Sequence, residues 1–77
     1  MNNTRRKELQ KQIDSLQEIK EALESIANDE QEAYDNMPEG LQESERGSNM
    51  YDNIDELGSI QDDIQSLCDQ IEEIINK

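Results

Sequence analysis

Apolar residues recur at spacings of three and four along two segments of the chain, which are separated by a stretch without this pattern. In the first segment Leu9, Leu16 and Leu23 are seven residues apart, and Ile19 and Ile26 follow the last two by three residues. The second segment has a similar broad face, made of Met50, Tyr51, Ile54, Leu57, Ile60, Ile64, Leu67, Cys68, Ile71, Ile74 and Ile75. Such periodicity is typical of amphipathic helices with a coiled-coil-like seam. The pattern therefore predicts two helices, over residues 4–36 and 44–76.

The intervening residues 37–43 are predicted to form the hinge of a helical hairpin. They lie within a longer stretch, Asp29–Gly47, that contains the only proline, Pro38, and two of the three glycines. The residue before a proline is disfavoured in helical geometry, so the first helix should end near Met37. Gly40 is then expected to permit the turn.

Hydroxyl side chains are the expected caps at the starts of both helices. Thr4 is the predicted N-cap of the first helix, and Ser44, in preference to Ser48, that of the second. Gly47 would then weaken the first turn of the second helix, because glycine has a low helix propensity. Basic residues at Arg5–Lys7 oppose the helix dipole, so this end should fray unless the acidic surface of a partner holds it.

An antiparallel pairing of the two helices brings apolar residues together along the whole length when the numbers of paired residues add up to about 84. This register pairs Leu9 with Ile75, Ile13 with Ile71, Leu16 with Cys68, Ala27 with Leu57, and Tyr34 with Met50. It also places Ile26 beside Gly58, where the missing side chain would leave room for the isoleucine. The expected fold is all-α, a coiled-coil-like antiparallel hairpin that forms a single domain over residues 1–77.

The apolar stripes are too wide for two helices to cover. In an isolated hairpin a row of residues beside the seam would stay in water, namely Ile19, Ile26, Ile60, Leu67 and Ile74. A chain of 77 residues with one cysteine and no histidine has neither a disulfide nor an obvious metal site to compensate. We therefore expect two copies to form a four-helix bundle. Its predicted core residues are Leu9, Ile13, Leu16, Leu23, Leu57, Ile64, Cys68, Ile71 and Ile75.

Charge is abundant and unevenly distributed along the chain. There are 20 acidic and 7 basic residues, giving a formal net charge of -13 at pH 7. Residues 1–20 hold five basic and three acidic side chains, whereas residues 21–77 hold two basic and seventeen acidic ones. This density argues against direct binding to nucleic acid or an anionic membrane and favours a protein partner with a basic surface.

The sequence offers little of what catalysis needs, and we expect a protein that is not an enzyme and uses no cofactor or metal. It has no histidine, and its three glycines are too far apart for a phosphate-binding loop. Cys68 lies on the apolar side of the second predicted helix without a cationic neighbour, which is typical of a buried, inert thiol. Acidic pairs such as Asp62–Asp63 and Glu72–Glu73 match no calcium-loop pattern and are typical of a solvated helix face.

The N-terminal segment carries basic residues without a following apolar run. Neither a signal peptide nor a membrane span is therefore predicted, and a cytoplasmic location is expected.

The acidic surface indicates a binding function. Carboxylates spaced along a rod imitate the phosphate track of nucleic acid and suit the basic channel of a nuclease, repressor or polymerase. Tyrosine and methionine, which are enriched in interfaces, cluster near the hinge. The candidate partner-binding residues are Glu32, Tyr34, Asp35, Met37, Glu39, Glu43, Glu45 and Tyr51. The alternative is a structural scaffold or oligomerisation module, in which the charge only maintains solubility and the tyrosines and methionines cap the bundle.

The central run Glu32-Ala33-Tyr34-Asp35-Asn36-Met37-Pro38-Glu39 resembles a motif in short, acidic helical-hairpin proteins encoded by phages and prophages of Gram-positive bacteria. The specific part of the likeness is the segment Asp29–Gly47, and the stretch Ser48–Tyr51 departs from it by carrying less charge. The resemblance implies an origin in a mobile element and a protein that binds and blocks a host factor, such as a defence nuclease, in the host cytoplasm. It implies no defined catalytic activity.

Overall fold

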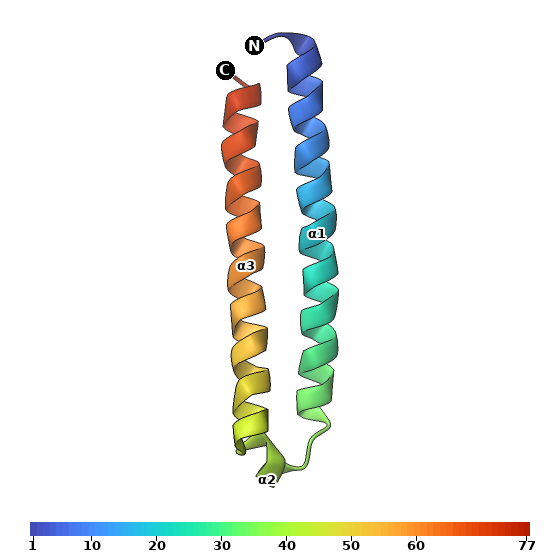
Figure 1. Ribbon diagram of the computed structural model, residues 1–77, viewed down its shortest axis with the longest axis vertical. Coiled ribbons are helices and arrows are strands. Elements are labelled where there is room, and N and C mark those ends of the chain that lie inside the picture. The colour runs from blue at the N-terminus through green and yellow to red at the C-terminus, as the bar shows by residue number, and fades with distance from the viewer.

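The computed structural model describes residues 1–77 and shows two long helices packed antiparallel as a hairpin (Figure 1). Helix α1 spans Asn3–Asp35, α2 spans Glu39–Gln42, and α3 spans Glu45–Ile75. The molecule is a rod of 58 × 15 × 12 Å with both termini at one end and the hinge at the other. The predicted all-α hairpin is confirmed, and each long helix begins and ends within one residue of its predicted limits. No helix is both long enough and apolar enough to cross a membrane.

The helix caps agree with the sequence prediction at α3 and differ at α1. Ser44 is the N-cap of α3, and its Oγ accepts a hydrogen bond from the Gly47 amide. At α1 the prediction of Thr4 is wrong, because Asn2 is the N-cap and its Oδ1 accepts from the Arg5 amide at 2.9 Å. Asparagine is among the strongest N-capping residues, and the helix begins one residue earlier than predicted, at Asn3.

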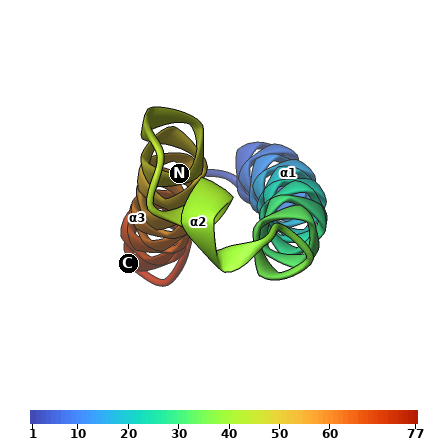
Figure 2. The ribbon, with the colours of Figure 1, turned by 90° about the horizontal axis from the view of Figure 1, so that it is seen from below.

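The hinge turns without any residue at positive φ. Asn36 ends α1, the Met37 amide donates to the Tyr34 carbonyl, and Pro38 then adopts an extended conformation immediately before α2. The expectation that Gly40 permits the turn is therefore wrong, since Gly40 lies inside the short helix α2. Viewed along the rod, α2 crosses the hinge end between the ends of the two long helices (Figure 2).

Gly47 is buried where the hinge folds back onto α3. A Cβ atom at this position would lie 2.3 Å from the Gln42 carbonyl oxygen and 2.6 Å from that of Leu41. These neighbours are backbone atoms, which cannot move aside as a flexible side chain could. Gly47 was expected to weaken the start of α3; the structure shows that it also allows α2 to lie against this helix.

The two long helices meet along a continuous seam of residues at heptad positions a and d. The seam consists of Leu9, Ile13, Leu16, Lys20, Leu23, Ala27, Glu30 and Tyr34 in α1 and of Met50, Ile54, Leu57, Gln61, Ile64, Cys68, Ile71 and Ile75 in α3, all buried or partly buried. Its buried cluster is made of Ile13, Ile64 and Cys68. Such uninterrupted spacing of three and four residues is the geometry of a two-stranded coiled coil.

Contacts across the seam agree with the predicted register. The Cys68 thiol lies 4.0 Å from the Ile13 carbonyl oxygen, and the Tyr34 and Tyr51 rings are neighbours. In these and the other side-chain contacts between α1 and the C-terminal helix, the residue numbers add up to between 81 and 85. One detail of the prediction is wrong: nothing lies within 4 Å of a Cβ built on Gly58, and Ile26 points into solvent instead.

Candidate protein-binding surfaces

The hairpin is a ribbon of two helices, and the heptad positions beside the seam define its two broad faces. In antiparallel helix pairs, residues at position e of one helix lie beside position e of the other, and the same holds for position g. Gln17 and Gln65 both occupy position e, and their side chains are hydrogen-bonded at 3.3 Å. This contact fixes one broad face, so residues at position g of both helices share the opposite one.

The middle of the face at position g is apolar. Its large apolar residues are Ile19 and Ile26 of α1 and Ile60, Leu67 and Ile74 of α3, and we call this set the apolar face. All five remain between 43% and 55% exposed. The sequence prediction that this row stays in water in a single hairpin is confirmed. The exposure is a property of the geometry, because two helices can turn only one stripe each toward one another.

The opposite broad face is polar, and hydrogen bonds on it join α1 to α3 across the seam. Gln65 accepts from Lys20 at 3.0 Å and from Gln17 at 3.3 Å, and its own amide donates to Asp69 at 3.0 Å. These residues were not singled out from the sequence. The signal was available, however, because Lys20 continues the spacing of three and four residues between Leu16 and Leu23.

The predicted partner-binding residues gather at the hinge end of the rod. Glu32, Asp35, Glu39, Glu43, Glu45 and Tyr51 are exposed, whereas Tyr34 and Met37 are partly buried. The rings of Tyr34 and Tyr51 lie 6.2 Å apart at an angle of 56°, a tilted aromatic contact that joins the ends of α1 and α3. Gln42 donates to the Tyr34 carbonyl at 2.9 Å and ties α2 to this contact. The hinge end therefore combines the contact between the two tyrosine rings with exposed carboxylates around it.

The predicted core residues lie along the seam of the single hairpin. Ile13, Ile64 and Cys68 are buried, and Leu9 and Leu57 are partly buried. Four others pack against the buried cluster, namely Leu16, Leu23, Ile71 and Ile75. The chain thus uses all nine residues for packing between α1 and α3.

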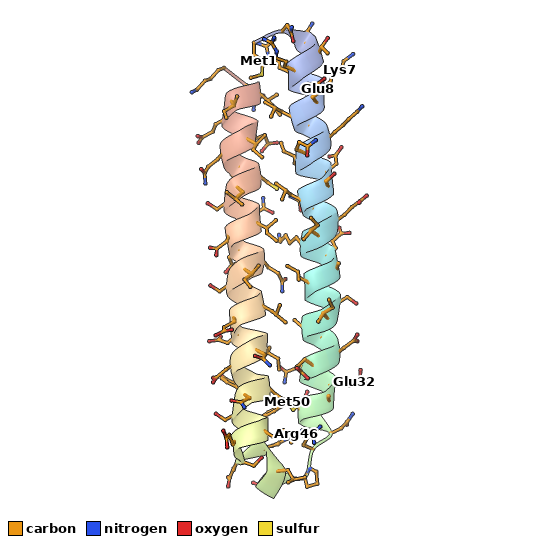
Figure 3. All side chains as sticks on the ribbon, in the orientation of Figure 1. Met1, Lys7, Glu8, Glu32, Arg46 and Met50 are labelled. Carbon is orange, nitrogen blue, oxygen red and sulfur yellow. The ribbon has the colours of Figure 1, made fainter.

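Charge divides the rod into two unlike halves. The hinge half, residues 21–63, holds fourteen acidic side chains and one basic side chain. The terminal half, residues 1–20 and 64–77, holds six of each sign. Lys7 lies at the terminal end, whereas Glu32 and the lone Arg46 lie near the hinge (Figure 3). The negative potential is therefore concentrated on one half of the molecule.

The side chains that could take part in chemistry are the Cys68 thiol and the carboxylates. Cys68 is only 2% exposed, and its thiol faces the Ile13 carbonyl inside the seam. No group of three or more histidine, cysteine, aspartate or glutamate side chains converges on a point where a metal ion could bind. The surface features of the rod are the apolar face, the acidic hinge half and the contact between the Tyr34 and Tyr51 rings. Comparison with protein-family models, curated proteins and solved structures finds no match to this chain.

Proposed function

We propose that this chain is a non-catalytic protein-binding module that works as a dimer in the cytoplasm and binds a host or defence protein with a basic surface. Binding would inhibit that protein by occupying the site where it holds nucleic acid. The observation that carries the proposal is the charge of the hinge half, which has fourteen carboxylates and only one basic group, the guanidinium of Arg46. Clustered charge of one sign steers an oppositely charged partner and raises its association rate.

The geometry of the acidic half supports nucleic-acid mimicry. Its carboxylates are carried by two antiparallel helices lying side by side, at the spacing of helical turns, about 5.4 Å, and not by a flexible tail. Most of them are exposed and free to meet lysine and arginine side chains of a partner. A fixed array of this kind loses less conformational entropy on binding than a disordered acidic segment does.

The hinge end supplies the less charged part of the proposed contact. Tyr51 is 58% exposed and rests against Tyr34, while Leu41 of α2 is 53% exposed. Aromatic and apolar side chains surrounded by polar residues are typical of binding hot spots. The likeness of the Glu32–Glu39 run to acidic phage hairpins supports the same site and a mobile-element origin.

The dimer is proposed to be a four-helix bundle formed by two hairpins. Its support is the exposed apolar face, because a rod with only five buried residues has little core of its own. Mass by light scattering should give twice 8.9 kDa, with helical circular dichroism on the same sample. Charged substitutions at both Leu16 and Ile64 should unfold the chain and so abolish the dimer, and a stable folded monomer from that variant would refute the bundle.

A salt titration tests the proposed inhibition. A non-specific nuclease with a basic DNA channel is mixed with labelled duplex DNA, and cleavage is measured with and without the hairpin at increasing ionic strength. Electrostatic mimicry predicts inhibition that weakens steeply with added salt, because exposed charges are screened. Inhibition that stays constant with salt would remove the mimicry mechanism.

Charge-neutral variants locate the surface. Replacing Glu32, Glu43 and Glu45 with glutamine should reduce inhibition at least about tenfold, since each exposed charge pair contributes up to about 1 kcal/mol. The matched control replaces Glu8, Glu72 and Glu73 of the terminal half with glutamine and removes the same net charge. Equal effects of the two variants would mean that only total charge matters, and the hinge site would be wrong.

The alternative function is a structural scaffold without a specific acidic-surface partner. The exposed apolar face favours it, because that surface is explained by self-association alone. In this case both glutamine variants would assemble normally, and neither would change any binding to basic proteins.

A further inference from the structure

The surface area of the chain shows how much of it is left uncovered. The solvent-accessible surface is 5777 Å². A globular monomer of this mass exposes about 4,800 Å² according to the usual scaling of surface with size. The excess of roughly 1,000 Å² is close to the roughly 800 Å² that each partner buries in a stable protein interface. One additional chain on one face is enough to remove it.

The apolar face is the surface that this second chain would cover. Its five residues lie on one of the two broad sides of a ribbon 58 Å long and 15 Å wide. The opposite broad side carries the Gln17, Lys20 and Gln65 network, whose polar groups already have partners across the seam. Covering the apolar face gains hydrophobic stabilisation without breaking these hydrogen bonds.

Charge decides the orientation of the two rods. In a parallel pair the two hinge halves would lie side by side, bringing together two sets of fourteen acidic and one basic side chains. In an antiparallel pair each hinge half lies beside a terminal half with six basic side chains. Like charges at short range are strongly unfavourable, whereas in the antiparallel pair each acidic half lies beside a half whose charges balance.

Two shallow grooves at opposite ends of the apolar face agree with this orientation. One is at the terminal end and is lined by Met1, Arg5, Glu8, Leu9 and Gln12. The other is in the hinge half and is lined by Glu30, Asn53, Glu56, Leu57 and Ile60. A two-fold axis through the middle of the face brings the groove containing arginine opposite the groove containing two glutamates.

The same two-fold axis places Ile74 of each copy against the hinge half of the other copy. Gln17 and Lys20 of α1 both contact Gln65 of α3. Ile19, which lies between them in the sequence, is therefore at the same height along the rod as Gln65. We take this height as the middle of the apolar face. Ile74 lies nine residues beyond this point and Glu56 nine residues before it, which is about 14 Å in each direction. Ile74 of one copy therefore meets the hinge-half groove of the other.

We infer that a second copy of this chain docks on the apolar face in antiparallel orientation, so that each acidic hinge half lies along the terminal half of the other copy. The inference rests on the proposed dimer and adds its surface and direction. It also assigns a partner to the basic first turn of α1, whose charges oppose the helix dipole. In the assembled pair that turn lies near the acidic hinge of the second copy.

Zero-length cross-linking of the unaltered chain tests the direction. A carbodiimide joins lysine amines to nearby carboxylates, and mixing ¹⁴N- and ¹⁵N-labelled chains marks the links that form between copies. We expect mixed-isotope links from Lys77 to Glu56 of the other copy, because the axis near residue 65 places α3 against α3 of the other copy and residue 77 near residue 53. Within one hairpin these groups are roughly 25–40 Å apart along the rod, so they cannot be linked. Links between copies that stay within the terminal halves would indicate a parallel pair and overturn the inference.

A matched pair of variants tests the surface. Ile60→Glu places a charge on the apolar face, whereas Ser59→Glu places the same charge on the adjacent, outward-facing residue. We expect Ile60→Glu to raise the dimer dissociation constant at least about 100-fold, because the symmetric interface buries the charge twice, and Ser59→Glu to change it less than about threefold. Equal dissociation constants for the two variants would place the interface elsewhere.

The outcomes separate this inference from the proposed function. A monomeric mass for the unaltered chain at every concentration would remove the dimer itself. A dimer with terminal-half links, or one indifferent to Ile60→Glu, would leave the proposed function standing and remove only the antiparallel docking. If Ile60→Glu loses its helical circular dichroism, the cross-link map of the unaltered chain still decides the question.

Discussion

The seam and the apolar face are built from the same residue types on the same two helices, yet only one of them is covered. In the seam Cys68 is 2% and Ile64 7% exposed, whereas Ile26 and Ile60 on the apolar face are 55% and 44% exposed. The difference lies in the heptad position and not in hydrophobicity. One residue of displacement along a helix, about 100° of rotation, separates a side chain that packs against the partner helix from one that meets water. The comparison shows that the hairpin leaves a second apolar surface uncovered.

The largest expected effect comes from breaking the seam. Ile64→Asp would bury a carboxylate within the apolar cluster, beside Ile13 and Cys68. We expect a loss of more than about 4 kcal/mol in the free energy of unfolding, enough to abolish the helical circular dichroism. Ser66→Asp, two residues away on the exposed outer edge, is the control and should remain helical. A folded Ile64→Asp chain would contradict the assignment of the core to the seam.

A smaller loss of stability is expected at Gly47, where the hinge packs against α3. Gly47→Ala places a methyl group 2.3 Å from the Gln42 carbonyl oxygen. Relieving this overlap requires α2 to move, and we expect the free energy of unfolding to fall by about 1–3 kcal/mol, despite the better helix propensity of alanine. Urea denaturation measures the change. A gain in stability would mean that the contact between α2 and α3 is absent in solution.

The corresponding change away from the hinge should have the opposite sign. A Cβ atom on Gly58 meets nothing within 4 Å, so Gly58→Ala adds helix propensity without a clash. We expect stabilisation by about 0.5–1 kcal/mol, measured by the same denaturation. Destabilisation would show that another surface packs closely against this position.

The smallest effect is expected on the polar face. Gln65→Ala removes the acceptor for Lys20 and Gln17, but all three groups are partly solvated. We expect a loss of about 0.5 kcal/mol and an unchanged dimer dissociation constant. Weakened dimerisation in this variant would mean that the polar face, and not the apolar one, lies between the copies.

The fold could be predicted from the sequence because the controlling signals are local and periodic. The repeat of Leu9, Leu16 and Leu23, together with the break at Pro38, gives two helices and a turn, and the hydroxyl of Ser44, a hydrogen-bonding cap, marks the start of the second. The register followed from pairing apolar residues, and the contact between Cys68 and Ile13 agrees with it. The exposed row at position g was predictable for the same reason.

The details that escaped prediction depend on contacts between residues apart in the chain or on competition between neighbours. Thr4 and Asn2 are both capable caps, and only the backbone path selects Asn2. The packing of α2 onto Gly47 is invisible in a propensity scale, which rates glycine only as a weak helix former. The predicted binding residues are brought together at the hinge end, but their partner depends on a surface that this sequence does not contain.

The position of the single cysteine allows the separation of α1 and α3 to be measured by thiol labelling. The Cys68 thiol is shut inside the seam against Ile13, and there is no second cysteine to react with it. A disulfide reagent can modify it only when α1 and α3 separate, because modification requires an accessible thiolate. The labelling rate of the unaltered protein therefore counts opening events of the rod, and a partner that clamps the two helices together would slow the rate without any engineered probe.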